Sequence, residues 1–376
     1  MIYLDNAATS FPKAPGVANA VSSFLNDIGA NAGRSSYKAA RDSARIIFQT
    51  RTLLAKLLNT DNSERICFTM NCTQALNIAI KGLVKPGFKV LTSPYEHNSV
   101  MRPLRWLESK GEISVNTFKI NKFEIDWQNL ETQLDNHTDL LVINAASNVN
   151  GFILPFSKIA RLARTLGIPI ILDAAQALGT IPINAPQFDV ICFPGHKGLL
   201  GPMGTGGLFV AKGLELQTLI QGGTGSRSSL ELQPTLMPDR LEAGTPNLPG
   251  LAGLHASLEF ILNTGIKTIA AHKRQLTNRL LQGLATIEGI KIHSPAQPEL
   301  QAGVVSITSD KHHVSDLAWK FDQANIACRM GLHCAPGAHK QLGTFENGGT
   351  LRLSPGYFNT IAEIDQVIEF LQELHK

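Results

Sequence analysis

IPIILDAAQ at residues 168–176 and FDVICFPGHKG at residues 188–198 are two short apolar runs that each end abruptly at polar residues. The first run ends at Asp173 and the second is followed by Lys197. Apolar runs of this length are typical of strands buried on both faces of a parallel sheet. Ligands bind beyond the carboxyl ends of such strands, so these polar residues are the first candidates for a functional site.

The same pattern extends on both sides of these two runs, from residue 65 to residue 210. Further strand candidates, separated by helical periodicity at 73–83 and 156–167, lie at residues 65–69, 88–93, 140–146 and 206–211. Strands that alternate with helices predict an α/β fold, in which a mostly parallel sheet has helices on both faces.

The pattern changes near Leu251, where a long helical stretch begins. Beyond it we expect helices near residues 268–286, 313–324 and 361–375, and strands near 302–307 and 350–354. A chain of 376 residues is long enough for two packed domains. We predict a large domain over residues 15–255 and a smaller C-terminal α/β domain over residues 256–376, which residues 1–14 join.

Composition excludes several classes of protein. A hydrophobic content of 43% with 17% charged residues is that of a globular protein and not of a disordered one. The net charge of +4 is small and no basic run occurs, so neither nucleic acid nor a membrane is expected as a partner. The N-terminal sequence has no charged leader before an apolar core, and no apolar run approaches the ~18 residues of a membrane span. We expect a cytoplasmic protein.

The five cysteines show no CxxC spacing, which argues against a zinc or redox site. Cys67 and Cys192 lie inside strand-like runs and are expected to be buried hydrophobic residues. The His312-His313 pair has no third ligand at a suitable spacing, so we expect the start of a solvated helix there and no metal.

Asp173 and Lys197, at the ends of successive strands, together predict a site for pyridoxal 5′-phosphate (PLP). This cofactor needs an acid that keeps its pyridine nitrogen protonated and a lysine that binds it as a Schiff base. Alone, such an aspartate would more often cap a helix or form a salt bridge, and such a lysine would be solvated. Both residues on successive strand ends, with the lysine inside Gly-His-Lys-Gly, are a much more specific signal.

Motifs along nearly the whole chain resemble the class V aminotransferase family of fold-type I PLP enzymes, and within it the group II cysteine desulfurases and selenocysteine lyases. They are YLDNAATS (3–10), SNVNG (147–151), LDAAQALG (172–179), FPGHKGLLGPMGTGGLFV (193–210), EAGTPN (242–247), CRMGLHCAP (328–336) and LRLSPGYFNT (351–360). The resemblance implies the fold of a fold-type I PLP-dependent transferase and a homodimer.

The resemblance also implies roles around the cofactor ring. Lys197 would carry PLP, and Asp173 would pair with the ring nitrogen. Gln176 and Asn148 would lie near the phenolic oxygen, and His97 would stack on the ring. The alternative for His97 is a histidine at a helix start with no ligand.

For the cofactor phosphate, the family match is Asn71-Cys72-Thr73 at the start of a helix, where free N–H groups favour an anion. Related enzymes usually have Gly-Thr-Thr there, so Thr73 remains as the hydroxyl donor; it is also a candidate N-cap. His196 would add a contact, whereas Pro194 replaces a serine that group II members often use. Thr245 resembles the residue that these dimers lend to the neighbouring subunit's phosphate.

Arg352 matches the arginine that binds the substrate α-carboxylate, for which a bidentate guanidinium is well suited. The alternative is a strand arginine that pairs with a structural acid. Arg329, Asn6 and Ala7 would line the same pocket.

Cys334 lies in a short loop flanked by glycine and proline that resembles the catalytic loop of group II desulfurases. The resemblance implies that L-cysteine is converted to L-alanine and that a persulfide on Cys334 passes to a sulfur-acceptor protein. Either His333 or His97 would supply a proton. Alternatives are a selenocysteine lyase acting on L-selenocysteine, a class V aminotransferase without desulfurase activity, and a non-catalytic scaffold.

Overall fold

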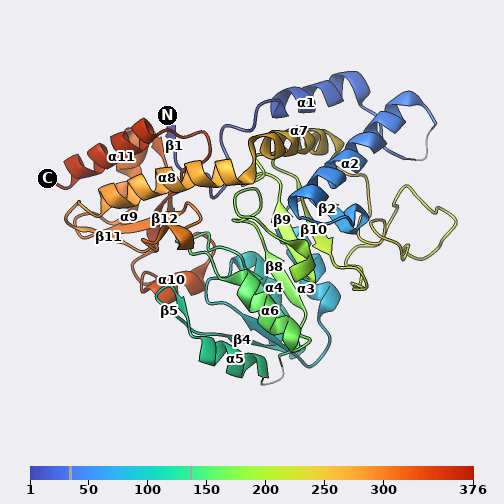
Figure 1. Ribbon diagram of the computed structural model, residues 1–376, viewed down its shortest axis with the longest axis horizontal. Coiled ribbons are helices and arrows are strands. Elements are labelled where there is room, and N and C mark those ends of the chain that lie inside the picture. Colours follow the sequence, from blue (N-terminus) through green and yellow to red (C-terminus); the bar gives the residue numbers. More distant parts are fainter. Residues whose placement is uncertain (34–35, 136–137) are drawn as a thin grey trace.

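A computed structural model describes residues 1–33, 36–135 and 138–376 (Figure 1). Its centre is a seven-stranded sheet with the order β2-β10-β9-β8-β7-β3-β4. The strands are β2 (Ile66–Thr69), β3 (Phe88–Thr92), β4 (Ile113–Thr117), β7 (Leu140–Asn144), β8 (Ile170–Asp173), β9 (Val190–Pro194) and β10 (Gly206–Val210). Neighbours pair in parallel except for β10, which is antiparallel to β2 and β9. The predicted mostly parallel α/β sheet is confirmed.

Both faces of this sheet are covered, as the continuous apolar runs predicted. Along β7, Leu141 and Ile143 belong to one hydrophobic core, and Leu140 and Val142 belong to another. The first core includes α2 (Lys38–Leu57), α5 (Trp127–Asp135), α6 (Phe156–Thr165) and α7 (Leu248–Thr264). The second core includes α3 (Cys72–Leu83) and α4 (Asn98–Ser109).

The C-terminal part has an antiparallel sheet with the order β11-β12-β15-β14. Its strands are β11 (Ile290–Ile292), β12 (Val305–Ser309), β14 (Arg329–Gly331) and β15 (Thr350–Leu353). The helices packed in its core are α8 (Ile266–Leu284), α9 (Val314–Gln323) and α11 (Ile361–Leu374). His313, predicted to start a solvated helix, is the exposed N-cap of α9.

The N-terminus packs against this C-terminal part, where Figure 1 places both chain ends. Strand β1 (Ile2–Tyr3) pairs in parallel with β13 (Ile326–Ala327), and Leu4 lies in the C-terminal core. We propose that the chain divides into a large domain over residues 15–255 and a smaller domain over residues 256–376. Residues 1–14 join the smaller domain, and α7 connects the two domains.

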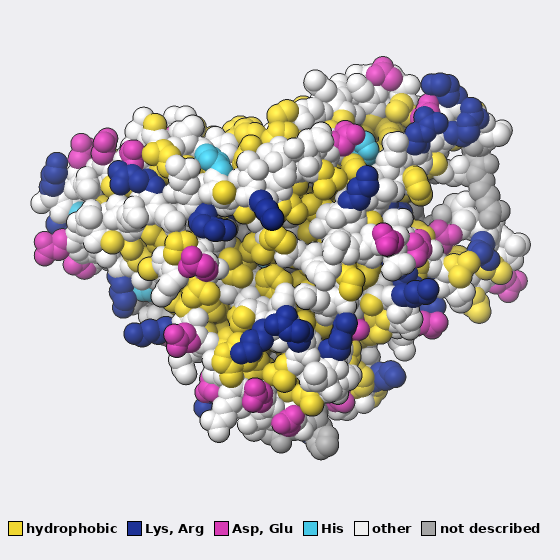
Figure 2. Space-filling view, in the orientation of Figure 1, with side chains coloured by type: hydrophobic (Ala, Val, Ile, Leu, Met, Phe, Trp, Pro, Cys, Tyr) yellow, Lys and Arg dark blue, Asp and Glu magenta, His cyan; other side chains and the backbone are white. Residues whose placement is uncertain are grey.

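Smaller elements complete the described chain. They are α1 (Val17–Ser23), a π-helical turn (Phe24–Ile28), the hairpin strands β5 (Ile120–Asn121) and β6 (Glu124–Ile125), α10 (Pro336–Leu342), and 3₁₀ turns at Ser63–Arg65, Ala185–Gln187 and Pro298–Leu300. No helix in the described ranges combines the length and the apolar character needed to cross a membrane. Figure 2 shows acidic and basic side chains interspersed on one face, as the small net charge of +4 suggests.

The turns that follow β8 and β9 approach each other so closely that only glycine fits. Gly179 has φ +91°, and a Cβ there would lie 2.3 Å from the carbonyl oxygen of Gly198. A Cβ on Gly198 would lie 2.4 Å from the carbonyl oxygen of Leu178. This contact fixes the backbone beside Lys197 against the turn that follows Asp173.

We predict that Gly179→Ala lowers the free energy of unfolding by more than about 3 kcal/mol, because the Cβ adds a backbone clash to a left-handed conformation. Gly167→Ala is the matched control, since Gly167 also has a positive φ (+69°) but a Cβ at this position would meet no atom within 4 Å. It should cost only about 1–2 kcal/mol. Urea titration of both variants measures the difference, and equal losses would contradict the role of the close approach.

Candidate active site

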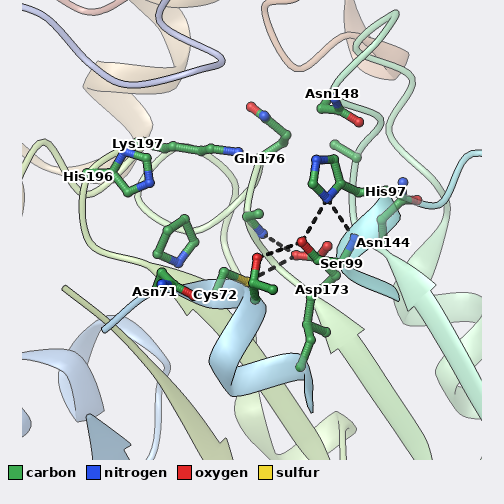
Figure 3. A pocket seen from close by; sticks show the side chains of 15 residues that line it. Asn71, Cys72, His97, Ser99, Asn144, Asn148, Asp173, Gln176, His196 and Lys197 are labelled. Atoms are coloured by element: carbon green, nitrogen blue, oxygen red, sulfur yellow. Dashed lines mark hydrogen bonds between the residues drawn. The ribbon is translucent and has the colours of Figure 1, made fainter. Parts of the chain in front are cut away.

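A pocket lies at the carboxyl ends of β7, β8 and β9, beside the N-termini of α3 and α4 (Figure 3). The predicted site residues that line it are Cys72, Thr73, His97, Asn148, Asp173, Gln176, His196 and Lys197. A second pocket shares Gln176 and Lys197 with the first and is also lined by Asn6 and Ala7. The fold therefore brings most of the predicted residues together around Lys197.

Asp173 is buried and Lys197 is half-buried at this edge of the sheet. The Oδ1 atom of Asp173 accepts hydrogen bonds from the N–H of Ala175 at 2.9 Å and from the thiol of Cys72 at 3.6 Å. Burial raises the pKa of Asp173 and lowers the pKa of Lys197, while the charge of each residue opposes the shift of the other. A lysine with a lowered pKa is a better nucleophile, which suits covalent chemistry at Lys197.

The N-terminus of α3 points into the pocket. Asn71 is its N-cap, and its side chain accepts a hydrogen bond from the N–H of Gln74 at 2.9 Å. The alternative interpretation of Thr73 as the N-cap is therefore wrong; its hydroxyl lies 2.7 Å from that of Ser99. The N–H groups of Cys72 and Thr73 are in the first turn, where an α-helix supplies them no internal acceptor. This end of the helix is suited to bind an anion.

His97 is the N-cap of α4 and also lines the pocket, so its stacking on the cofactor ring stays a prediction. Its Nδ1 accepts a hydrogen bond from the N–H of Ser99 at 3.0 Å, which leaves the hydrogen of a neutral ring on Nε2. Burial lowers the pKa of His97 to about 4, and the charges of Lys197 and Arg329 act in the same direction. His97 is therefore a neutral ring near pH 7.

His196 connects the pocket to the N-terminal segment. Its Nδ1 lies 3.1 Å from the hydroxyl of Thr9, and its carbonyl accepts hydrogen bonds from the N–H of Ser10 at 2.9 Å and from Lys13 Nζ at 3.2 Å. Burial lowers the pKa of His196 to about 4. The same segment reaches Gln176, whose side-chain amide donates to the carbonyl of Ala7 at 2.9 Å.

Arg352 is 1% exposed and is paired with an acid in this structure. Its Nη2 lies 2.6 Å from Oδ1 of Asp5, and its Nη1 donates to the carbonyl of Asn148 at 2.9 Å. This is the pairing of a strand arginine with an acid that the alternative interpretation described. The role of Arg352 in binding the substrate carboxylate stays a prediction. Arg329 is exposed and pairs with Arg352 in the register of β14 and β15, so two positive charges lie together. Both charges contribute to lowering the pKa of Lys197, although burial contributes most.

Cys334 is exposed in a loop whose backbone is hydrogen-bonded to residues at and beside the first pocket. Its carbonyl accepts a hydrogen bond from the N–H of Asn98, and the carbonyl of His333 accepts one from Nδ2 of Asn148, both at 2.7 Å. The ring of His333 is buried, with Nε2 lying 3.1 Å from the carbonyl of Thr350, and burial lowers its pKa to about 2. Of the two histidines considered as proton donors, His97 lines the pocket, whereas the ring of His333 contacts Thr350 of β15.

The other cysteines are poor nucleophiles. The predicted burial of Cys67 and Cys192 is confirmed, Cys72 is also buried, and burial raises the pKa of each of these thiols. Cys328 is half-buried, and burial together with the charge of Asp5 raises its pKa to about 12.

Thr245 is exposed and lines neither pocket of its own chain. Other residues near the site were not predicted from the sequence: Asp5, Asn98, Ser99 and Asn144. Each lies in or beside a motif or strand end that was recognised, and that position was the available signal.

Comparisons with known proteins agree with this geometry. A family model described as aminotransferase class V matches residues 2–367. The probable cysteine desulfurase of Methanothermobacter thermautotrophicus is 33% identical over 99% of this chain and 94% of that protein, and the one of Pyrococcus abyssi is 31% identical over 100% and 94%. The apo structure of cysteine desulfurase from Thermococcus onnurineus NA1 superposes with a TM-score of 0.93 at 29% identity, covering 100% of this chain and 94% of that one.

Proposed function

The chain belongs to the class V aminotransferase family, and from this membership we propose that it is a PLP-dependent cysteine desulfurase. One observation carries the proposal: the loop that exposes Cys334 is hydrogen-bonded to residues at the rim of the pocket that holds Asp173 and Lys197. A transaminase has no use for such a thiol. The free cysteines suit the reducing cytoplasm, where we propose that the enzyme acts.

The residues present fit PLP. The pocket offers a buried acid, a lysine with a lowered pKa and a helix N-terminus suited to a phosphate. Oδ1 of Asn148 is buried and has no partner in the described chain, so it is available to a ligand hydroxyl. The residues that would hold PLP are Lys197 covalently, Asp173 at the ring nitrogen, Gln176 and Asn148 at the phenolic oxygen, His97 on the ring, and Cys72, Thr73 and His196 at the phosphate.

PLP, when bound, supplies a ring that accepts electrons from the substrate. Arg352 and Arg329 would hold the α-carboxylate of L-cysteine, and Lys197 Nζ would remove its α-proton. The thiolate of Cys334 would attack the substrate sulfur, so that an S–S bond forms and the C–S bond breaks with its electron pair left on carbon. That β-carbon takes a proton, the α-carbon regains the proton that Lys197 removed, and the product leaves as L-alanine. Because His97 is neutral near pH 7, we propose Lys197 Nζ as the proton carrier.

The persulfide would remain on Cys334 until an acceptor takes the sulfur. The loop spans only residues 332–335 between β14 and α10, and two hydrogen bonds hold its backbone. Because this loop is short and anchored, we propose that a sulfur-acceptor protein must come to the exposed thiol.

Thr245 has a cofactor role only in a dimer, which we therefore propose. Residues 211–247 contain no helix or strand between β10 and α7, and Figure 1 shows this segment projecting from the body. It exposes several large apolar side chains, namely Leu219, Ile220, Leu230, Leu232 and Leu236. Burying them against a second copy would bring Thr245 to the neighbouring subunit's phosphate site.

The first prediction from the proposed function concerns the cofactor. Borohydride reduction of the PLP-loaded protein should fix the cofactor on Lys197 and on no other lysine, because Lys197 is the lysine that lines the pocket beside Asp173. Lys273 is an internal control. Burial lowers its pKa to about 8 as well, but Lys273 lines only the second pocket, away from Asp173. Peptide mapping by mass spectrometry locates the label, and label on Lys273 would contradict the assignment.

The second prediction concerns assembly. We expect a closed two-fold dimer, and Thr245→Ala should weaken PLP retention by roughly 1.5–3 kcal/mol, the worth of one charge-assisted hydrogen bond. Analytical ultracentrifugation and cofactor titration measure the two effects. A micromolar monomer that is fully loaded and active would refute the shared site.

The third prediction concerns the nucleophile. Cys334→Ala and Cys334→Ser should retain PLP but lose nearly all alanine production from L-cysteine, because the lost thiol acts after substrate binding. Turnover of L-selenocysteine should survive in part, since selenium is the better leaving group. Cys67→Ala and Cys192→Ala are controls that should cost about 1 kcal/mol of stability and no chemistry.

The measurements are parallel turnover of both substrates and mass spectrometry for a persulfide on Cys334. Alanine release from L-cysteine at the wild-type rate by Cys334→Ala would instead indicate a lyase, such as a selenocysteine lyase, that needs no thiol nucleophile; absence of alanine release by the wild type, with keto-acid formation, would indicate a transaminase.

A further inference from the structure

Asp5 lines neither pocket, yet it begins a continuous chain of contacts that ends at the Cys334 loop. Its Oδ1 lies 2.6 Å from Nη2 of Arg352. Nη1 of Arg352 donates to the carbonyl of Asn148 at 2.9 Å, and Nδ2 of Asn148 donates to the carbonyl of His333 at 2.7 Å. His333 is bonded directly to Cys334 along the chain.

The burial of Arg352 explains why it needs a counter-charge. Its guanidinium is almost completely removed from water, and its Nε has no hydrogen-bond partner in the described chain. An unpaired buried charge is strongly destabilising. Asp5 is the acid with which Arg352 forms an ion pair among the described residues, although the two are 347 positions apart in sequence.

The two contacts of Arg352 also fix its orientation. Asp5 holds Nη2 and Asn148 holds Nη1, so the plane of the guanidinium is defined before any ligand arrives. A pre-oriented arginine binds a planar carboxylate more tightly, because less side-chain entropy is lost on binding.

The backbone conformation of the Cys334 loop depends on the same chain of contacts. His333 and Cys334 have φ values of +47° and +57°, a left-handed conformation that residues other than glycine rarely adopt. Such a backbone persists only when neighbouring contacts hold it. The hydrogen bond from Asn148 is one of these contacts, and Arg352 holds Asn148 in turn.

We propose that Asp5 is a positioning residue: it orients Arg352 for the substrate carboxylate and, through Arg352 and Asn148, stabilises the loop that presents Cys334. This inference rests on the proposed function, in which Arg352 binds the α-carboxylate of the amino-acid substrate.

The test compares Asp5→Ala, Asp5→Asn and Asp5→Glu in the PLP-loaded enzyme. Calorimetry with L-alanine, the proposed product, measures carboxylate binding without desulfurase chemistry. Asp5→Ala should weaken this binding about 10- to 100-fold, the range for a hydrogen bond to a charged group. Asp5→Asn, which keeps an acceptor oxygen without the charge, should show a smaller loss, and Asp5→Glu should recover part of the affinity. With L-cysteine, KM should rise more than kcat falls, because the contact serves binding.

Two further measurements make the test specific. Alkylation of Cys334 by iodoacetamide, followed by mass spectrometry, should be several-fold faster in Asp5→Ala, because the loop loses part of its support. Asp322→Asn is the matched control: Asp322 is an exposed aspartate of the same C-terminal part, whose carboxylate makes no ion pair or hydrogen bond in the described ranges. It should leave L-alanine binding and alkylation unchanged.

Wild-type L-alanine affinity in both Asp5→Ala and Asp5→Asn would overturn the proposal, and an unchanged alkylation rate would overturn the link to the loop. If Asp5→Ala does not fold, the isosteric Asp5→Asn decides. Failure of the wild-type enzyme to release alanine from L-cysteine would refute the desulfurase function, while the comparison of L-alanine binding would still stand.

Discussion

The pocket that removes Asp173 and much of Lys197 from water is the constraint on which the site depends. Burial opposes the charged form of each residue. The N–H of Ala175 and then the charge of Lys197 favour the charged form of Asp173, and the charge of Asp173 favours that of Lys197. The sheet makes this pairing possible, because β8 and β9 are parallel neighbours whose carboxyl ends meet at one edge. The glycine contact between the turns that follow these strands then fixes the two backbones relative to each other.

The N-terminal segment connects this edge of the sheet to the C-terminal part. Ser10 donates its N–H to the carbonyl of His196, and Asn6 donates its side-chain amide to the carbonyl of Ser354 at 3.1 Å. The ion pair between Asp5 and Arg352 lies beside these two anchors. A segment of a few residues therefore sets the position of the predicted carboxylate-binding arginine relative to Lys197.

Local patterns in the sequence predicted every strand of the central sheet except the edge strand β4, together with the polar residues at the strand ends, because apolar runs and strand length are properties of neighbouring residues. Contacts between distant segments could not be predicted in this way. Nothing in the sequence around Arg352 indicates a partner at Asp5, and a strand pattern carries no direction, so the antiparallel course of β10 was not anticipated. Thr73 has a side chain suited to an N-cap. The helix begins two residues earlier, however, so that Asn71 is the N-cap and accepts the hydrogen bond from the N–H of Gln74.

The five cysteines differ in exposure, and this difference supports Cys334 as the proposed nucleophile. A thiolate is the reactive form, and burial disfavours it in Cys67, Cys72 and Cys192. Cys334 is exposed instead, in a loop where it and His333 have left-handed backbones and where the carbonyl groups are hydrogen-bonded to residues at the pocket. Exposure and attachment are opposed in most loops, since an exposed loop has few partners. Here the partners bind the carbonyl groups of the loop and leave the side chain of Cys334 exposed, as the proposed reaction requires.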